Sequence, residues 1–235
     1  MKTKKVVKRK FNFKKFLILI LLVYLVINGT YYLLKRPVKN IIITGNKEVK
    51  DYEIIEAANL KNYPSFISIN KSKITKTLKQ NPFIKDVQIK KNFKFQITIT
   101  EEKVVAYNLT NQSYLLSNGT YINDKNFLGV PQLNNYTPED VLKNFAEELG
   151  KLDEDIIADI SEIEYSPSKN ETGETIDSTR FKLKMKDGNT VYINVKKCNV
   201  LSYYNQIYAS LKDKKGVLNL DSGNYERYVL TLYEE

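Results

Sequence analysis

Histidine is absent from this 235-residue chain, and cysteine occurs only once, at Cys198. Without histidine the chain cannot build a Ser-His-Asp or Cys-His catalytic centre, or the HExxH zinc site of metalloproteases. A single thiol cannot form an intramolecular disulfide, nor can it assemble a thiolate metal site alone. The sequence therefore predicts no metal site and no cofactor, and Cys198 is expected to be a small core residue.

Glycine is also scarce, and its nine residues are scattered singly, so no glycine-rich phosphate-binding loop is present. Ser72-Lys73 and Ser168-Lys169 leave a Ser-Lys hydrolase formally open, but 33 lysines make such neighbours common by chance. Carboxylate neighbours such as Glu101-Glu102 and Glu147-Glu148 point to different faces of a strand or helix. We therefore expect no catalytic residues and a protein that is not an enzyme.

Arginine occurs four times, which is too few for extensive base readout or bidentate phosphate binding. The net charge of +10 is confined to one end of the chain. Residues 1–36 hold ten of the 37 basic residues and no acidic one, so residues 37–235 carry 27 of each sign. This distribution indicates a membrane partner and argues against nucleic acid.

A long apolar run, residues 16–34, follows the basic tail and contains no charged residue. As a helix it is about 28 Å long, which is close to the thickness of the hydrocarbon core of a bilayer. A cleaved signal peptide is the alternative, but its apolar region is shorter and precedes a small-residue cleavage site that is missing here. The run therefore predicts an uncleaved transmembrane helix.

The orientation of this helix follows from its flanks. Eight basic residues precede it within residues 1–15, whereas only Lys35 and Arg36 follow it. By the positive-inside rule, the tail 1–15 is cytoplasmic and residues 37–235 are extracellular.

Residues 37–107 predict a small module with the element order β-α-α-β-β. Its first strand, 38–44, ends at the turn Gly45-Asn46, and a short helix starts near Asp51. Asn70 is expected to cap a second helix that ends before Pro82. Two strands of alternating apolar and polar residues close the module, with Val87 and Ile89 in one and Phe95, Ile97 and Ile99 in the other.

Residues 108–235 predict a second, mixed β domain with flanking helices, which makes the fold class α+β. Thr137 is expected to cap a helix with Pro138 at its first position. Residues 181–185 and 191–195 alternate around Asp187-Gly188, which is typical of a hairpin. Residues 200–211 predict one more helix, and 217–220 and 228–233 predict closing strands. The polar segment 168–178 is expected to be a long exposed hairpin loop.

The first module resembles the FtsQ-type POTRA domain of the FtsQ/DivIB family of cell-division proteins. Three stretches carry the resemblance, and two positions, Val104 and the turn Asn92-Phe93, depart from it by lacking the family's usual proline. The matching residues are Ile42, Ile43, Gly45 and Asn46; Leu78, Asn81, Pro82, Phe83, Ile84 and Lys85; and 97–103 followed by Val105, Ala106 and Tyr107.

The second module resembles the β domain of the same family, so that the resemblance spans nearly the whole chain. It lies in the segment 160–163, the hairpin 184–188, the pair Lys215-Gly216, and the pattern that begins at Leu220 and Asp221. The resemblance implies a non-catalytic, single-pass membrane protein enriched at the division septum, which recruits FtsL-type and FtsB/DivIC-type division proteins.

In the family, the docking edge for these partners is the carboxy-terminal strand of the β domain. The resemblance places partner-binding residues at Val217, Leu218, Asn219, Leu220, Asp221, Gly223, Tyr225 and Tyr228. The alternative for Leu218 and Leu220 is the core, and for Asp221 and Gly223 a simple turn. The alternative for the whole protein is an anchored extracytoplasmic sensor, or a module that binds envelope polymers and is unrelated to division.

Overall fold

A computed structural model describes residues 12–38, 40–91, 94–123, 125–210, 214–221 and 229–233, which divide into two compact units. The first unit extends to Lys79 and includes Val87–Ile99, and the second comprises Gln80–Asp86 and the chain from Thr100 onward. Helices and strands occur in both, so the fold class is α+β as predicted.

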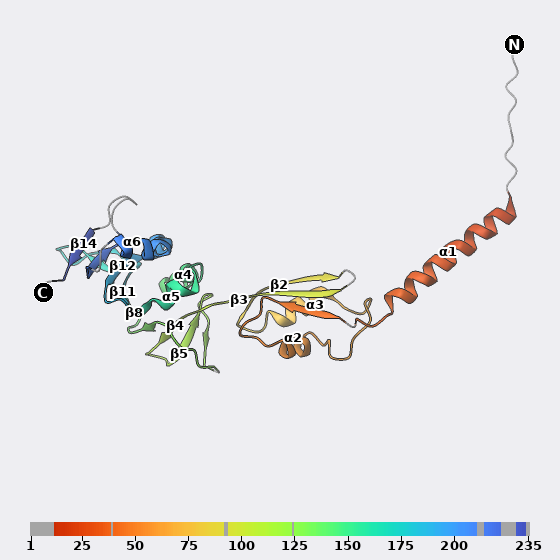
Figure 1. Ribbon diagram of the computed structural model, residues 1–235, viewed down its shortest axis with the longest axis horizontal. Coiled ribbons are helices and arrows are strands. Elements are labelled where there is room, and N and C mark those ends of the chain that lie inside the picture. The colour runs from red at the N-terminus through yellow and green to blue at the C-terminus, as the bar shows by residue number, and fades with distance from the viewer. Residues whose placement is uncertain are drawn as a thin grey trace, which may run out of the picture. The chain divides into compact units, whose positions relative to one another are not determined.

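Helix α1 (Phe13–Leu34) confirms the predicted apolar helix and begins three residues earlier than expected (Figure 1). The Oδ1 atom of Asn12 caps it by accepting a hydrogen bond from the Lys15 amide. Its 22 residues are about 33 Å long, and none of their side chains is buried in the protein. Within the described part of the chain, α1 is the single helix that is long and apolar enough to cross a membrane.

The remainder of the first unit has the predicted order of elements around a small sheet. Strand β1 lies parallel to β3, with Ile41 opposite Phe95 and Ile43 opposite Ile97, and β2 lies on the other side of β3. Asn70 caps α3, as the sequence predicts, by accepting the Lys73 amide at 3.1 Å. The elements are β1 (Ile41–Thr44), α2 (Asp51–Ala57), α3 (Lys71–Leu78), β2 (Ile84–Lys91) and β3 (Phe95–Glu101), of which residues 84–86 of β2 and 100–101 of β3 belong to the second unit.

Gly45, which follows β1, occupies a position that requires glycine. Its φ of +84° lies in the left-handed region, and a Cβ there would be 2.1 Å from the carbonyl oxygen of Ile99. The side-chain amide (Nδ2) of Asn46 donates to the Val49 carbonyl at 2.9 Å and to the Asp51 carboxylate at 2.7 Å. These contacts explain why the predicted Gly-Asn turn ends β1 and leads into α2.

A mixed sheet of nine strands, counted over the described residues, forms the second unit and is here called the larger sheet (Figure 1). Its strand order is β14-β13-β12-β11-β8-β7-β4-β5-β6. The strands are β4 (Val104–Asn108), β5 (Ser113–Leu116), β6 (Tyr121–Ile122), β7 (Gln132–Leu133), β8 (Ile160–Tyr165), β11 (Arg180–Met185), β12 (Thr190–Asn194), β13 (Gly216–Asn219) and β14 (Val229–Leu232).

One face of the larger sheet packs on helices and forms the core of the second unit. Phe145 on a helix stacks on Phe181 of β11, with ring centroids 3.7 Å apart. Leu183, Val191 and Ile193 alternate with polar residues along the hairpin and are fully buried, as the sequence predicts. The helices are α4 (Glu139–Leu149), α5 (Glu154–Ala158), the 3₁₀ helix η1 (Val195–Tyr203) and α6 (Tyr204–Ser210).

Two of the helix predictions are corrected. The cap of α4 is Pro138, and the buried Thr137 hydroxyl has no hydrogen-bond partner among the described atoms, so Thr137 is not the cap. The helix predicted at 200–211 is a 3₁₀ helix that begins at Val195 and continues as α6. Its start is set by Asn194, whose side chain accepts the Lys197 amide.

The chain enters the larger sheet earlier than the sequence suggested. Strand β4 was assigned to the first module, but it pairs with β5 and β7 of the larger sheet. The segment 168–178 is indeed a hairpin, formed by β9 (Ser168–Lys169) and β10 (Thr175–Asp177).

Candidate partner-binding edge of the larger sheet

Strand β13 is an interior strand that carries three of the eight predicted site residues, Val217, Leu218 and Asn219, and Leu220 and Asp221 follow it directly. It runs parallel to β12, with Val217 opposite Thr190, and antiparallel to β14, with Val217 opposite Thr231. Among the strands that the structure describes, β14 is therefore the edge at this end of the larger sheet, and β6 is the edge at the other end (Figure 1). A partner strand could reach β14 directly but could not reach the backbone of β13.

The side chains of β13 alternate between the two faces of the sheet. Leu218 is 1% exposed and Leu220 is 0% exposed, and both belong to the core under α4 and η1. Val217 and Asn219 are half-buried and face the opposite side. The structure thus places the two leucines in the core, which was the alternative considered for them from sequence.

Asp221 closes β13 through an ion pair with β11. Its carboxylate lies 2.5 Å from Nε of Arg180, and both side chains are largely buried. The Arg180 guanidinium in turn stacks on the Tyr192 ring, 3.7 Å from the centroid. The amides of Leu220 and Asp221 both donate to the Tyr192 carbonyl, at 2.8 and 3.1 Å. Asp221 therefore fixes the end of β13, while the predicted residues Gly223, Tyr225 and Tyr228 lie outside the described residues.

The start of β13 is held by Asn189, which the sequence analysis did not single out. Asn189 is 1% exposed; its Oδ1 accepts the Gly216 amide at 2.9 Å, and its Nδ2 donates to the Tyr204 hydroxyl at 3.2 Å. Tyr204 donates in turn to Asp187 at 2.6 Å, and burial raises its pKa well above the usual tyrosine range. The sequence does not indicate this role of Asn189, because an asparagine after an Asp-Gly turn can be buried or exposed. Tertiary contacts decide which of the two occurs.

Gly216 allows β14 to pair closely with β13. A Cβ at Gly216 would lie 2.2 Å from the carbonyl oxygen of Thr231, so any side chain there would push β14 away. The pair Lys215-Gly216 is part of the family resemblance. The close contact of Gly216 with β14 could not be predicted from it, because the sequence does not show that β14 lies beside β13.

The outer side of β14 has unpaired backbone groups among the residues that the structure describes. The Tyr233 amide donates to the Lys215 carbonyl at 3.1 Å, which sets the alternation of bonded pairs along β13 and β14. Because such pairs alternate in antiparallel strands, the amides and carbonyls of Leu230 and Leu232 point away from β13. Leu230 packs partly on the core, whereas Leu232 is 49% exposed.

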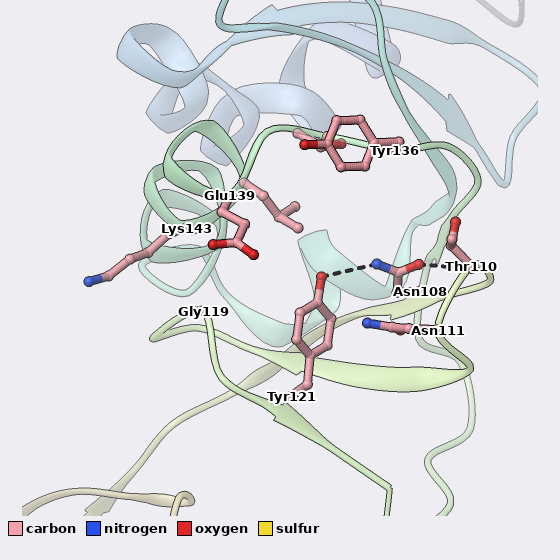
Figure 2. Close-up of a pocket in the computed structure, with 10 residues that line it drawn as sticks. Asn108, Thr110, Asn111, Gly119, Tyr121, Tyr136, Glu139 and Lys143 are labelled. Carbon is pink, nitrogen blue, oxygen red and sulfur yellow. Dashed lines mark hydrogen bonds between the residues drawn. The ribbon is translucent and has the colours of Figure 1, made fainter.

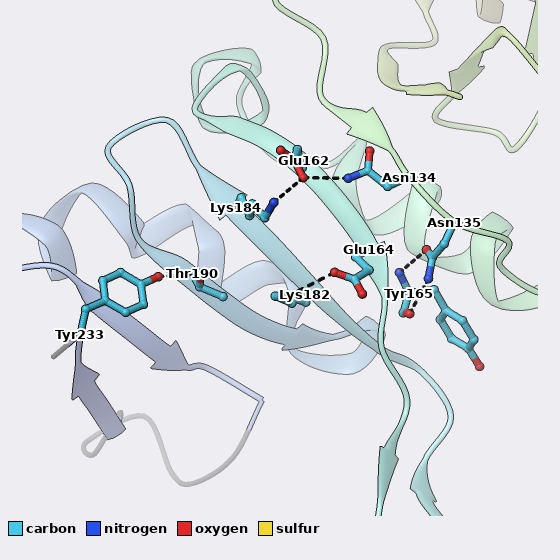
Figure 3. A network of polar contacts seen from close by, with 9 residues as sticks. All are labelled: Asn134, Asn135, Glu162, Glu164, Tyr165, Lys182, Lys184, Thr190 and Tyr233. Atoms are coloured by element: carbon cyan, nitrogen blue, oxygen red, sulfur yellow. Dashed lines mark hydrogen bonds and ion pairs between the residues drawn. The ribbon is translucent and has the colours of Figure 1, made fainter. Parts of the chain in front are cut away.

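The face of the larger sheet opposite the core is polar, and its side chains pair across strands (Figure 3). Lys184 of β11 lies 2.8 Å from Glu162 of β8, and this hydrogen bond lowers the pKa of Glu162. At the β14 end, the Tyr233 hydroxyl donates to the Thr190 hydroxyl of β12 at 2.7 Å. Tyr233 thus ties the edge strand to β12 across β13.

A pocket of about 450 Å³ lies at the other end of this unit, between α4 and strands β4 to β6 (Figure 2). The Tyr121 hydroxyl accepts a hydrogen bond from Asn108 at 3.0 Å, so its own proton is available to a ligand. The buried Thr137 hydroxyl also lines the pocket and has no partner among the described atoms. Tyr136, 75% exposed, forms part of the rim.

No group of three potential metal ligands occurs among the described residues. Cys198 is fully buried in η1, and this burial, with a smaller effect of the Glu148 charge, raises the pKa of its thiol to about 12. A thiol in such surroundings is protonated and unreactive at neutral pH.

Comparison with known proteins places this architecture among bacterial division proteins. The family model of the POTRA domain, FtsQ-type, matches residues 36–102. Cell division protein DivIB of Listeria monocytogenes is 31% identical over 195 residues, which cover 79% of this chain and 70% of the relative. Cell division protein DivIB of Bacillus subtilis is 31% identical over 198 residues, which cover 80% and 73% of the two chains.

A solved structure also shows similarity. It is the major extracytoplasmic domain of the trans isomer of the cell division protein DivIB from Geobacillus stearothermophilus, which is 24% identical. The match covers 48% of this chain and 96% of that chain, with a TM-score of 0.38. The two curated relatives match at more than 30% identity over more than two thirds of their length, and the chain therefore belongs to the DivIB family of cell division proteins.

Proposed function

We propose that this protein is a non-catalytic scaffold of the division machinery, anchored by α1 with its amino terminus in the cytoplasm and enriched at the septum. Its second unit recruits other bitopic division proteins of the FtsL type and the FtsB/DivIC type. Membership of a division-protein family supports the role in division, and the exposed edge strand β14 supports the mode of recruitment. In this proposal residues 1–15 are the cytoplasmic tail; the POTRA module, predicted at 37–107, ends before β4, and the β domain, predicted at 108–235, includes β4.

The binding mode is strand addition to β14. A partner strand laid beside β14 gains hydrogen bonds to the outward amides and carbonyls of Leu230 and Leu232, while its side chains alternate between the two faces. On the core side it meets Leu232, and on the polar side it meets Thr231 and Tyr233, all of which are exposed. Backbone bonding supplies affinity, and these side chains supply selectivity.

The predicted site residues have unequal roles in this proposal. Val217 and Asn219 lie one strand inward on the polar face, and Leu218 and Leu220 support the edge from the core. Asp221 fixes the end of β13. The family resemblance keeps Gly223, Tyr225 and Tyr228 as candidate contacts.

A proline substitution tests the backbone mode. Leu232→Pro removes an amide that points away from β13, so the β13–β14 pairing is kept, as proline is tolerated where its missing donor would face solvent. We expect pull-down of the FtsL–DivIC pair to weaken by at least about tenfold, because a hydrogen bond is lost and the ring blocks the incoming strand. Leu232→Thr, which keeps the amide, is the matched control and should bind normally.

Equal binding of both variants would rule out strand addition at this edge. A deletion of residues 229–235 should abolish binding while the rest of the second unit stays folded, since its core helices pack on strands inside β14. If that deletion binds the pair as the intact chain does, the partner site lies elsewhere.

The pocket favours a second candidate function, binding of an envelope saccharide. Two tyrosines, asparagines and an unpartnered buried hydroxyl offer aromatic surface and hydrogen bonds to a neutral, hydroxyl-rich ligand. Tyr121→Phe removes the available donor and should weaken binding of soluble peptidoglycan fragments, measured by calorimetry. Tyr203→Phe, at an exposed position outside the pocket, is the control; no heat with the intact protein would exclude this function.

A further inference from the structure

The carboxyl end of α1 is joined by backbone hydrogen bonds to the loop at residues 63–68. The contact links the last residue of the helix to a segment about thirty residues later in the chain. It resembles a short antiparallel ladder, with Pro37 and Ser65 forming a bridge at its centre. Its bonds run from the Ile67 amide to the Leu34 carbonyl at 3.2 Å, from Phe66 to Arg36 at 3.3 Å and from Val38 to Pro64 at 3.1 Å.

This ladder sets the depth of the loop relative to a bilayer crossed by α1. A helix of 22 residues is about as long as the hydrocarbon core is thick, so Leu34 lies at its boundary. Lys35 lies over the Tyr31 ring at 4.5 Å and Arg36 over the Tyr32 ring at 5.8 Å, an aromatic and basic girdle typical of the headgroup layer. Ile67, bonded to Leu34 itself, is at the same level.

The loop presents apolar side chains to its surroundings. Ile67 is 49% exposed and Tyr63 is 55% exposed, while neighbouring Ile69 is buried. Tyr63 has a φ of +45°, a backbone conformation that is costly for a bulky residue and that often marks functional positions. Exposure of these side chains would be unfavourable in water but favourable at an acyl-chain boundary.

Side-chain hydrogen bonds hold the backbone of the loop, and lysines lie beside it. The Ser68 hydroxyl donates to the Ser65 carbonyl at 2.8 Å, and Lys91 donates to the carbonyls of Phe66 and Ile69. Burial and, to a smaller extent, the nearby positive charge of Lys71 lower the pKa of Lys91, so Lys71 lies close to the side chain that holds the loop. The exposed Lys71 ammonium can attract anionic lipid headgroups.

We propose that this loop is a second membrane contact, in which Ile67 and Tyr63 enter the boundary between headgroups and acyl chains beside α1. The inference rests on α1 being the membrane anchor of the proposed function, and it adds a fixed attachment of the first unit to the bilayer. The contact would restrict how that unit tilts on its anchor.

The absence of tryptophan from the chain makes a fluorescence test direct. Ile67→Trp in the full chain is reconstituted in vesicles of equal parts phosphatidylcholine and phosphatidylglycerol. We expect blue-shifted emission that is quenched by lipids with a nitroxide near the top of the acyl chain and protected from aqueous acrylamide. Tyr63→Trp should behave in the same way and serves as the second variant if the first does not fold.

Tyr52→Trp is the matched control, because Tyr52 is 63% exposed and lies next to Asp51, which contacts Asn46 beyond the far end of β1. It should be quenched by acrylamide and not by the lipids. Leu25→Trp, in the middle of α1, tests the anchor itself. If Leu25→Trp is quenched by lipid but the loop variants behave like Tyr52→Trp, the second contact is refuted and the anchor stands; if Leu25→Trp is not quenched, both fail.

Discussion

Asp221 illustrates how a single side chain can hold the end of a strand. Its Oδ2 atom pairs with Nε of Arg180 at 2.5 Å, and the guanidinium is stacked on Tyr192, so the charge of Arg180 is largely removed from water. Loss of one partner from such a pair leaves the other charge buried without compensation. Asp221 therefore matters for the stability of this end of the larger sheet.

Asp221→Ala is expected to lower the free energy of unfolding of the second unit by about 3 kcal/mol, because it strands the Arg180 charge. Urea denaturation followed by circular dichroism measures this change. Glu164→Ala is the control: its pair with Lys182 at 3.3 Å is more exposed than the Arg180 pair and should contribute less than about 1 kcal/mol. Equal effects of both substitutions would show that burial of the Asp221–Arg180 pair does not increase its contribution to stability.

The thiol of Cys198 is buried, and its reactivity should reflect that burial. With a thiol pKa of about 12, native protein at pH 8 should react with a disulfide reagent about a thousandfold more slowly than urea-unfolded protein. The raised pKa also means that folding becomes less favourable as pH rises from about 9 toward 12, because the unfolded chain releases this proton first. Rapid labelling of the native protein would contradict the burial of Cys198.

Strand β14 depends on Gly216 of the neighbouring strand. Gly216→Val is expected to displace β14 while β12 and β11 keep their pairing, because the added side chain meets only the Thr231 and Leu232 backbone among the nearest atoms. Hydrogen exchange should then show lost protection of the Thr231 and Tyr233 amides and unchanged protection of Val191. Retained protection at Thr231 would show that the edge tolerates a side chain there.

Individual elements were predicted well where their signals are local. The cap at Asn70 and the hairpin around Asp187-Gly188 both lie where the sequence indicated. The prediction that Thr137 caps α4 was wrong. Its side chain is buried at the pocket, so tertiary packing outweighs the local preference of threonine for the cap position. The site residues on β13 followed from family resemblance, which does not show that β14 lies outside them.

At the scale of the whole molecule, charge and hydropathy are strongly segregated. Ten basic residues flank the apolar run 16–34, and residues 37–235 are formally neutral. If this asymmetry orients the protein as proposed, protease added to intact, wall-stripped cells should digest the chain beyond α1 and leave a short anchored fragment. An epitope tag at the amino terminus should survive in that fragment. Loss of the tag, or complete protection of the chain, would contradict the proposed orientation.

Apolar runs, periodicity and turn residues act within short segments, and they predicted the apolar helix, the fold class, the order of elements in the first unit and the family resemblance. Three-dimensional contacts were needed to show that β13 is interior and β14 an edge among the described strands, that Asn189 and Gly216 hold this edge, and that the Ile67 amide bonds to Leu34. Each of these depends on contacts between residues far apart in the chain. A local pattern specifies a strand but not its neighbours.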